Sequence, residues 1–247
     1  MTEQQRQSAI RLRLARSEER RVAALPTGFA ALDTALGGGF ARASIVELFG
    51  PSSSGKTTLA FQIVAHAQQD GATAAWIDAE HVFDASYASG LGVRVEEMPL
   101  AQPVSAEEAL EITYRLAASG AVDLVVVDSA AALVPQLELE SGMGEGTAGL
   151  HSRVLGSGLR RLAQVVGKSG TVLVFLNQTR FRKQGAGGEG ETSAGGASLK
   201  LYASLRLVLD SQTGGRVGFR VLKNKGAAAF REGELCRLRS GEFVKSP

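Results

Sequence analysis

The chain has 247 residues, of which 44% are apolar and 21% charged, which is enough apolar material for one large domain or two small ones. Its formal net charge of +2 favours no class of partner. No apolar stretch is long enough to cross a bilayer, and no apolar core of a signal peptide follows the basic N-terminus. We therefore expect a cytoplasmic protein without a membrane partner. The single cysteine, Cys236, excludes an internal disulfide and a cysteine-based zinc cluster.

Residues 1–25 are rich in arginine and are interpreted as a basic N-terminal arm and a candidate oligomerisation helix. After a turn at Pro26-Thr27-Gly28, apolar spacing predicts alternating helices and strands. In chain order these are a helix over Phe29–Leu36, a strand over Ser44–Phe49, a helix over Lys56–Ala67, strands over Ala72–Asp78 and Val95–Leu100, a helix from Ser105 to Gly120, a strand over Val122–Val127, a helix striped by Leu155, Leu159, Leu162 and Val166, and a strand over Thr171–Leu176. Ser105 and Glu108 form a capping box at the start of the third helix.

The remaining segments predict a different connection of strands. Ala203–Leu209, Arg216–Leu222 and Glu234–Leu238 have no long helices between them, so hairpin-connected strands are expected at one edge. The fold class is therefore α/β, with a mostly parallel central sheet, flanking helices and an antiparallel C-terminal edge. Glu138–Gly149 and Gln184–Ala197 carry few structure signals and are interpreted as functional or disordered loops.

The most informative motif is G-x-x-x-x-G-K-[ST], a loop that holds nucleotide phosphates. Its residues are Gly50, Pro51, Ser52, Ser53, Ser54, Gly55, Lys56 and Thr57. Backbone N–H groups of such a loop and the positive end of the next helix surround phosphate, Lys56 reaches the terminal phosphates, and Thr57 ligates Mg²⁺. A chance match occurs in about one chain in a hundred of this length, and the flanking strand and helix make chance a weaker explanation here.

Two carboxylates follow other predicted strands. Asp128 ends the run Val122–Val127, where a second magnesium-orienting group is expected beside a phosphate loop. The alternative is an aspartate that caps the next turn. Glu80 follows the strand Ala72–Asp78 and could deprotonate an attacking water, although most glutamates in such places are only solvated.

These motifs, taken with later ones, resemble the core of the bacterial RecA recombinase family, a P-loop NTPase. The resemblance covers roughly Pro26–Phe230 in the same order and at similar spacing. It rests on Gly50–Thr58, Ile77–His81, Val126–Ser129 with Ala131–Leu133, Asn177-Gln178, Gly195-Gly196 with Leu199-Lys200, and Lys223-Asn224-Lys225.

The resemblance assigns roles to residues of the nucleotide site. It implies Glu80 as the catalytic carboxylate, Thr58 as part of the phosphate site, and Asp84 and Tyr87 as the residues that hold adenine. Gln178 would sense the γ-phosphate, and a loop that starts a few residues later would respond to it. Lys223 and Lys225, which a strand would point the same way, would reach a neighbouring subunit's ATP. Without the resemblance, both lysines would be interpreted as a solvated strand face.

DNA contacts are expected from two loops. Glu138–Gly149 resembles the first, followed by Arg153 and Arg160, which share one stripe of a helix; an ordinary solvated face is the alternative. In the second, Arg180 and Arg182 stand on the entry side, and Gly195 and Gly196 let backbone N–H groups approach phosphate. Few aromatic residues lie there, so backbone tracking is expected rather than base stacking.

The resemblance predicts an ATPase core over 26–240 and a tail over 241–247, without the family's C-terminal domain. Lys183, Ala197 and Leu201 depart from the family's pattern at the second loop and at subunit coupling. The leading hypothesis is an ATP- and Mg²⁺-dependent recombinase that assembles as a filament or ring on single-stranded DNA and pairs it with homologous duplex. The alternatives are a regulatory partner of other repair proteins that does not exchange strands, and a P-loop ATPase with no nucleic-acid role.

Overall fold

The computed structural model describes residues 24–141, 149–184, 188–194, 197–211, 215–238 and 240–244. Most of the predicted N-terminal arm lies outside these residues, as do Gly195 and Gly196. In chain order the elements are β1 Ala24–Leu25, α2 Ala30–Leu36, β2 Phe40–Ala41, β3 Ser44–Gly50, α3 Lys56–Gln69, β4 Ala74–Asp78, α4 Ala85–Gly90, η1 Val95–Glu97, β5 Leu100–Ala101, α5 Ala106–Ser119, β6 Leu124–Asp128, η2 Ala130–Ala132, α6 Gln136–Glu140, α7 Leu150–Ser169, β7 Val172–Gln184, β8 Gly188–Ser193, α8 Ala197–Tyr202, β9 Leu205–Ser211, β10 Arg216–Asn224 and β11 Glu232–Cys236.

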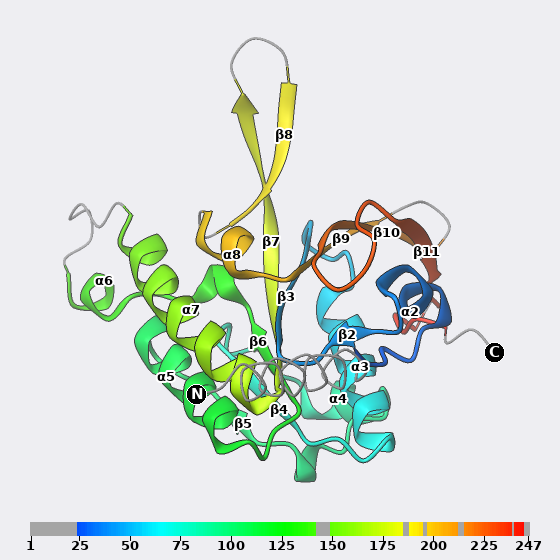
Figure 1. Cartoon of the computed structure of the whole chain (residues 1–247), viewed down its shortest axis with the longest axis horizontal. Coiled ribbons are helices and arrows are strands. Elements are labelled where there is room, and N and C mark those ends of the chain that lie inside the picture. The colour runs from blue at the N-terminus through cyan, green and yellow to red at the C-terminus, as the bar shows by residue number, and fades with distance from the viewer. Residues whose placement is uncertain are drawn as a thin grey trace, which may run out of the picture.

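The described strands form a nine-stranded sheet in the order β11-β10-β9-β3-β7-β6-β4-β5, with β8 paired to β7 (Figure 1). Strands β9, β3, β7, β6, β4 and β5 are parallel, whereas β10 and β11 are antiparallel additions at one edge. This confirms the predicted fold class, which is α/β with a mostly parallel central sheet, flanking helices and an antiparallel C-terminal edge.

Helices cover both faces of the sheet, and strand β6 shows why. Leu124 and Val126 point into a core shared with α3, while Val125 and Val127 point into a second core shared with α5 and α7. Because side chains of a strand alternate between faces, a run of branched apolar residues suits a strand that is covered on both sides. All five residues of β6 are buried.

The helix ends follow the capping chemistry of the sequence. The Ser105 side chain accepts a hydrogen bond from the Glu108 N–H at 3.2 Å, and Gly120 ends α5 in the left-handed conformation. The Glu108 carboxylate accepts from the N–H of Val104 rather than that of Ser105, so the predicted box closes one residue earlier. On α7, the four stripe residues are all buried, as predicted.

Some local predictions were wrong. Val95–Leu100 was expected to be a strand, but Val95–Glu97 forms a 3₁₀ turn and only Leu100 and Ala101 pair with β4. Gln184–Ala197 was expected to lack structure, but Gly188–Ser193 forms β8, which pairs antiparallel with β7 from Gln184 back to Thr179. In Figure 1 this hairpin extends beyond the rest of the described fold. The backbone pairing of β7 and β8 places Arg180 opposite Thr192 and Arg182 opposite Gly190.

Candidate nucleotide site and nucleic-acid interface

The phosphate-loop motif joins the carboxyl end of β3 to the amino end of α3. Gly55 has a φ of 91° and precedes α3 without a side-chain hydrogen bond to the first turn. A Cβ at Gly50 would lie 2.3 Å from the carbonyl oxygen of Leu209, so only glycine fits there. The first N–H groups of α3 are therefore not occupied by a capping side chain, and the helix dipole makes this end favourable for an anion.

The side chains of the loop fit a phosphate-bearing ligand. The Lys56 ammonium donates to the carbonyl oxygens of Pro51 and Gly50, at 2.7 and 3.1 Å. Burial lowers the pKa of Lys56, and the carboxylates of Asp128 and Glu80 offset part of that effect. The hydroxyl of Ser54 is buried and has no hydrogen-bond partner among the described residues. A cationic donor held by weak carbonyl acceptors can exchange them for phosphate oxygens.

Thr57 and Asp128 come together where a divalent metal would be held beside the nucleotide. The Thr57 hydroxyl donates to Asp128 Oδ2 at 3.1 Å. Burial of Asp128, and next the charge of Glu80, raise the pKa of its carboxyl group to about 7. An oxygen pair of hydroxyl and carboxylate suits Mg²⁺, which binds few protein groups directly and takes the rest of its ligands from phosphate and water. Within the described residues no three His, Cys, Asp or Glu side chains form a metal cage of their own.

Glu80 lies beside Asp128 because β4 and β6 end at the same level of the sheet. Asp78 pairs in register with Asp128, and the N–H groups of Ala79 and Glu80 donate to the Asp128 carbonyl. The exposed Glu80 carboxylate accepts a hydrogen bond from the Ser129 hydroxyl. Sequence reasoning proposed no role for Ser129, although it directly follows the predicted metal residue.

Asp78 was also missed as a site residue. Its buried carboxylate accepts hydrogen bonds from the N–H groups of Val82 and Phe83 and from the Gln102 amide, at 3.3, 3.0 and 2.8 Å. It therefore fixes the segment that leaves β4 and carries Glu80. A carboxylate at the end of a buried strand was the available signal.

The predicted adenine residues lie beside the start of α3. Asp84 caps α4 by accepting from the Tyr87 N–H at 2.9 Å, and the Tyr87 hydroxyl shares a hydrogen bond of 2.8 Å with Thr58. The Tyr87 ring is half-buried and meets Phe61 edge-on, with ring centroids 6.2 Å apart. The structure thus connects all three predicted residues to one another. The contact with adenine stays a prediction.

The last described segment also borders the phosphate loop, which no sequence signal indicated. Arg237 donates to the Gly241 carbonyl at 2.7 Å and to the Ser53 carbonyl at 3.3 Å. Phe243, beyond the predicted end of the core at residue 240, is buried, and a Cβ at Gly55 would lie 2.8 Å from its ring. The loop is therefore packed from behind by residues far along the chain.

Gln178 stands where the sheet continues into the hairpin. Strand β3 pairs with β7 so that Gly50 lies opposite Gln178. The Gln178 side chain is exposed. The backbone carbonyl of Gln178 accepts a hydrogen bond from the N–H of Ala194 at 2.9 Å. The same residue therefore stands beside the phosphate loop and closes the base of the hairpin.

Lys223 and Lys225 lie away from the chain's own phosphate loop. The Lys223 ammonium donates to the carbonyls of Lys200 and Leu201 at the end of α8, at 3.0 and 3.1 Å. Burial lowers the Lys223 pKa, with smaller contributions from the charges of Lys225 and Arg206. Both lysines were expected on one strand. Strand β10 ends at Asn224, so it contains Lys223 but not Lys225.

The Lys225 N–H donates to Ser204, whose own N–H donates to Ile45. At 3.3 Å per residue, Ile45 lies roughly 16 Å along β3 from Gly50. That separation is too long for a lysine side chain to bridge. Lys225 therefore cannot reach a triphosphate held by this chain's own phosphate loop.

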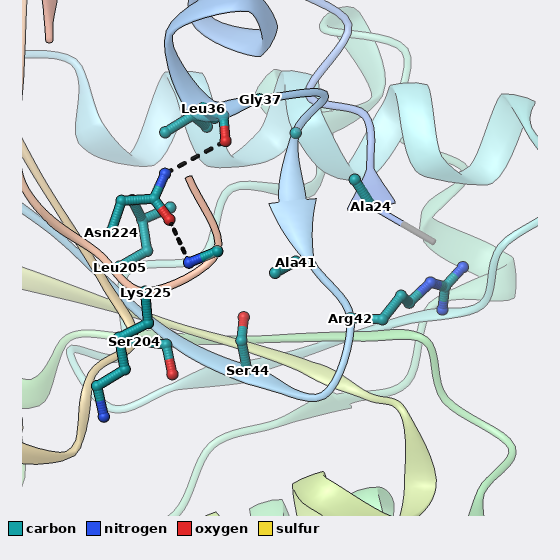
Figure 2. A pocket seen from close by; sticks show the side chains of 12 residues that line it. Ala24, Leu36, Gly37, Ala41, Arg42, Ser44, Ser204, Leu205, Asn224 and Lys225 are labelled. Carbon is teal, nitrogen blue, oxygen red and sulfur yellow. Dashed lines mark hydrogen bonds between the residues drawn. The ribbon is translucent and has the colours of Figure 1, made fainter. Parts of the chain in front are cut away.

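A cavity of about 310 Å³ opens near Lys225, at the amino end of β3 (Figure 2). Asn224 crosses it, donating to the Leu36 carbonyl at 3.2 Å and accepting from the Gly226 N–H at 2.9 Å. Ser44 lines this cavity, whereas the phosphate loop begins at Gly50, at the opposite end of the same strand. The cavity is thus separate from the candidate nucleotide site.

The two α7 arginines predicted to contact DNA are exposed on one helix. Arg160 Nε donates to the Tyr202 hydroxyl of α8 at 3.3 Å. A Cβ at Gly156 would lie 2.8 Å from the Ser198 hydroxyl, so glycine lets α8 pack closely on α7. Arg161 instead lies over the Tyr114 ring of α5 and pairs with Glu111. Arg160 thus lies on the side of α7 that faces α8, and Arg153 is exposed. It is Arg161 that contacts α5.

The fold and this site define a P-loop nucleotide-binding protein. The family described as RecA N-terminal domain matches residues 2–241. Protein RecA of Thermus thermophilus is 48% identical over 235 residues, 91% of this chain and 69% of that protein. Protein RecA 1 of Myxococcus xanthus is 46% identical over 229 residues, 89% of this chain and 67% of that protein. Protein RecA of Bacillus subtilis (strain 168) is 45% identical over 234 residues, 91% and 67% of the two chains.

The chain belongs to the RecA family, as the resemblance predicted. Among the helices that the structure describes, none has the length and hydropathy needed to cross a membrane.

Proposed function

We propose that the protein is an ATP-dependent, single-stranded-DNA-binding recombinase that pairs homologous DNA and exchanges strands. The observation that carries the proposal is the convergence of Lys56, Thr57, Glu80, Asp128 and Gln178 at the carboxyl ends of adjacent parallel strands. In open α/β sheets this edge is where ligands bind. The similarity to RecA proteins over nine-tenths of the chain supports the assignment of ATP and DNA as ligands.

The phosphate loop and α3 would hold the triphosphate, and Thr57 with Asp128 would hold Mg²⁺. When bound, Mg²⁺-ATP supplies a phosphoryl group whose oxygens the metal polarises. Lys56 would then exchange the carbonyls of Gly50 and Pro51 for phosphate oxygens. Glu80, which accepts a hydrogen bond from the Ser129 hydroxyl, would accept a proton from an attacking water.

Assembly into a filament or ring would complete this site. Lys225 is too far from its own loop, so we infer that Lys223 and Lys225 act on the nucleotide of a neighbouring copy, where two cations stabilise developing charge. Lys223 must first leave the carbonyls at the end of α8. In this proposal, α8 and the hairpin that precedes it would connect the nucleotide site, the DNA site and the interface between copies.

For DNA, Arg153, Arg160, Arg180 and Arg182, with the backbone of Gly195 and Gly196, are proposed to bind phosphates and leave the bases free to pair. A regulatory repair partner without strand exchange is the second candidate. It is favoured by Leu201, which departs from the family's pattern and is 68% exposed on α8. We propose an arm over 1–25, a core over 26–240 and a tail over 241–247 as the domain limits, although Leu25 and Phe243 are buried in the core.

ATP hydrolysis measured with and without single-stranded DNA tests the proposal. We expect DNA to stimulate hydrolysis several-fold, and Lys56→Ala to reduce hydrolysis by about 100-fold or more. Lys168→Ala, at an exposed lysine in the last turn of α7, is the matched control and should behave like the parent protein. Absence of DNA stimulation at low salt contradicts the proposal. Strand exchange between homologous substrates separates the recombinase from the regulatory partner.

A further inference from the structure

A buried ion pair joins strands β3 and β9 just below the phosphate loop. Arg206 Nε lies 2.5 Å from Glu47 Oε2, and the two side chains are 7% and 0% exposed. The residues are opposite each other in the parallel pairing of β3 and β9. Neither belongs to the motifs that mark the nucleotide site.

The remaining hydrogen bonds of this pair lead to the hairpin. Glu47 Oε1 accepts from the Asn177 amide at 3.0 Å, and the same amide donates to the Ala194 carbonyl at 3.0 Å. Arg206 Nη2 donates to the Ser193 hydroxyl at 3.2 Å. Both charged residues therefore reach the point where β8 ends, one directly and one through Asn177.

The same network reaches the phosphate loop from two sides. Asn177 Oδ1 accepts from the N–H of Gln178 at 2.9 Å, which fixes the residue opposite Gly50. The Arg206 guanidinium lies over the Phe49 ring, 4.7 Å from its centroid, and Phe49 directly precedes Gly50. These directional contacts thus connect three places: the carboxyl end of β3, the middle of β7 at Asn177, and the last residue of β8, Ser193.

Stability alone does not account for such a network. A buried ion pair loses its hydration on folding, and well-packed apolar side chains of similar volume are often as stabilising or more so. What an apolar pair cannot supply is a set of directional bonds that fixes three strand ends relative to one another. The pair is therefore suited to positioning rather than to stabilising the core.

We propose that Glu47 and Arg206 are positioning residues that hold the base of the β7–β8 hairpin at a fixed place relative to the phosphate loop. Nucleotide bound at the loop then changes the hairpin through Asn177, Gln178 and Ser193. This inference rests on the proposed function only in taking the phosphate loop as a nucleotide site. It does not depend on DNA binding or strand exchange.

Backbone hydrogen exchange of residues 179–184 and 188–193, with and without a slowly hydrolysed ATP analogue and Mg²⁺, tests the inference. In the parent protein, the nucleotide should change the exchange rate of these amides at least threefold. The variant to compare is Glu47→Leu combined with Arg206→Met, which leaves no uncompensated buried charge. It should bind the analogue within threefold of the parent protein, keep its thermal stability, and lose the hairpin response.

A second ion pair supplies the matched control. Arg42, in the turn between β2 and β3, pairs with Asp123, which precedes β6. Asp123 accepts from the N–H of Val172 at the far end of β7, and neither residue has a described bond to the paired part of the hairpin, residues 179–184 and 188–193. Arg42→Met combined with Asp123→Asn should keep the full hairpin response. A normal response in the Glu47/Arg206 variant overturns the inference, as does a parent protein that binds the analogue without any change in the hairpin.

Failure of the proposed function gives a different result. If the hairpin responds to nucleotide in the parent protein and not in the variant, the positioning role holds even when DNA neither stimulates hydrolysis nor binds. The two ideas are therefore tested by separate measurements on the same samples.

Discussion

Gly50 and Gln178 lie opposite each other on the adjacent parallel strands β3 and β7. One begins the phosphate loop, and the other closes the base of the hairpin through its bond with Ala194. The two proposed ligand sites therefore start at the same level of the sheet, on neighbouring strands. Adjacent strands lie about 4.8 Å apart, so a side chain at Gln178 can reach what the loop holds.

This relationship predicts that Gln178→Ala uncouples DNA affinity from nucleotide. The affinity for single-stranded DNA should no longer rise when the slowly hydrolysed ATP analogue is added. The affinity for the analogue itself should stay within about threefold of that of the parent protein, because most of the protein groups that would donate to it lie in the loop and α3. Fluorescence anisotropy of a labelled oligonucleotide measures the first quantity, and titration of the analogue the second. Gln164→Ala, at an exposed position of α7, is a suitable control. A variant that keeps the nucleotide effect on DNA would contradict the coupling.

Asp128 predicts a pH dependence of stability in the nucleotide- and metal-free protein. Because the pKa of its carboxyl group is raised to about 7 in the folded state, its contribution is fully present below the ordinary carboxyl pKa and is lost as pH rises through about 7. Between pH 6 and pH 8 this loss amounts to roughly 1.4 kcal/mol.

Asp128→Asn removes that ionisation. The free energy of unfolding is measured by urea denaturation in EDTA. Between pH 6 and pH 8 it should fall less for the variant than for the parent protein. Added Mg²⁺-nucleotide should stabilise the parent protein more at pH 8 than at pH 6, since the metal needs the ionised carboxylate. Parallel pH profiles for the two proteins would show that Asp128 is not the group responsible.

Arg237 predicts an effect on nucleotide affinity from outside the motif. Arg237→Met removes the bonds to the Ser53 and Gly241 carbonyls and a cation near the loop, so nucleotide should bind roughly 2- to 10-fold more weakly. Arg216→Met is the matched control, because Arg216 lies on the same sheet edge but pairs with Glu234. Isothermal titration of both variants decides the matter, and equal affinities would remove Arg237 from the site.

The α7 arginines predict a change in salt dependence. Each phosphate contact on single-stranded DNA contributes about 0.7 to the slope of log affinity against log salt. Arg153→Gln with Arg160→Gln should therefore lower the magnitude of the slope by roughly 1.4. Arg161→Gln, on the α5 side of the same helix, should leave the slope unchanged. An unchanged slope in the double variant would indicate that this face does not contact DNA.

The sequence predicted the parts of the fold that have a strong local pattern. Branched apolar runs indicated the buried strands, and the stripe Leu155, Leu159, Leu162 and Val166 indicated the buried face of α7. The Val95–Leu100 prediction failed because so short a segment is decided by what it packs against: Val95 packs on the core beneath α4, and only Leu100 and Ala101 reach β4.

The glycine-rich second loop misled in a different way. Low apolar content suggested no regular structure, but antiparallel backbone pairing with β7 needs no apolar face, and β8 forms from Gly188 to Ser193. The predicted strand Thr171–Leu176 stopped short of Gln178, whereas β7 continues to Gln184 and includes that residue.

In the site, residues inside the motif were predictable, whereas those that support it were not. Glu47 and Arg206 each interrupt an apolar strand, so each alone would be interpreted as a residue on a solvated face. Only the register of β3 against β9 shows that the two meet and are buried. The antiparallel edge that carries Arg237 was predicted, but no pattern in the sequence indicates that its last strand leads back to the phosphate loop.

Phe243 gives the phosphate loop a dependence on the order of synthesis. Its ring fills the space behind Gly55, yet it belongs to the last described residues of the chain. On a translating ribosome the loop emerges long before the ring that backs it, because domains are made from the N-terminus onward. A nascent chain therefore completes the packing behind Gly55 only after Phe243 has left the ribosome.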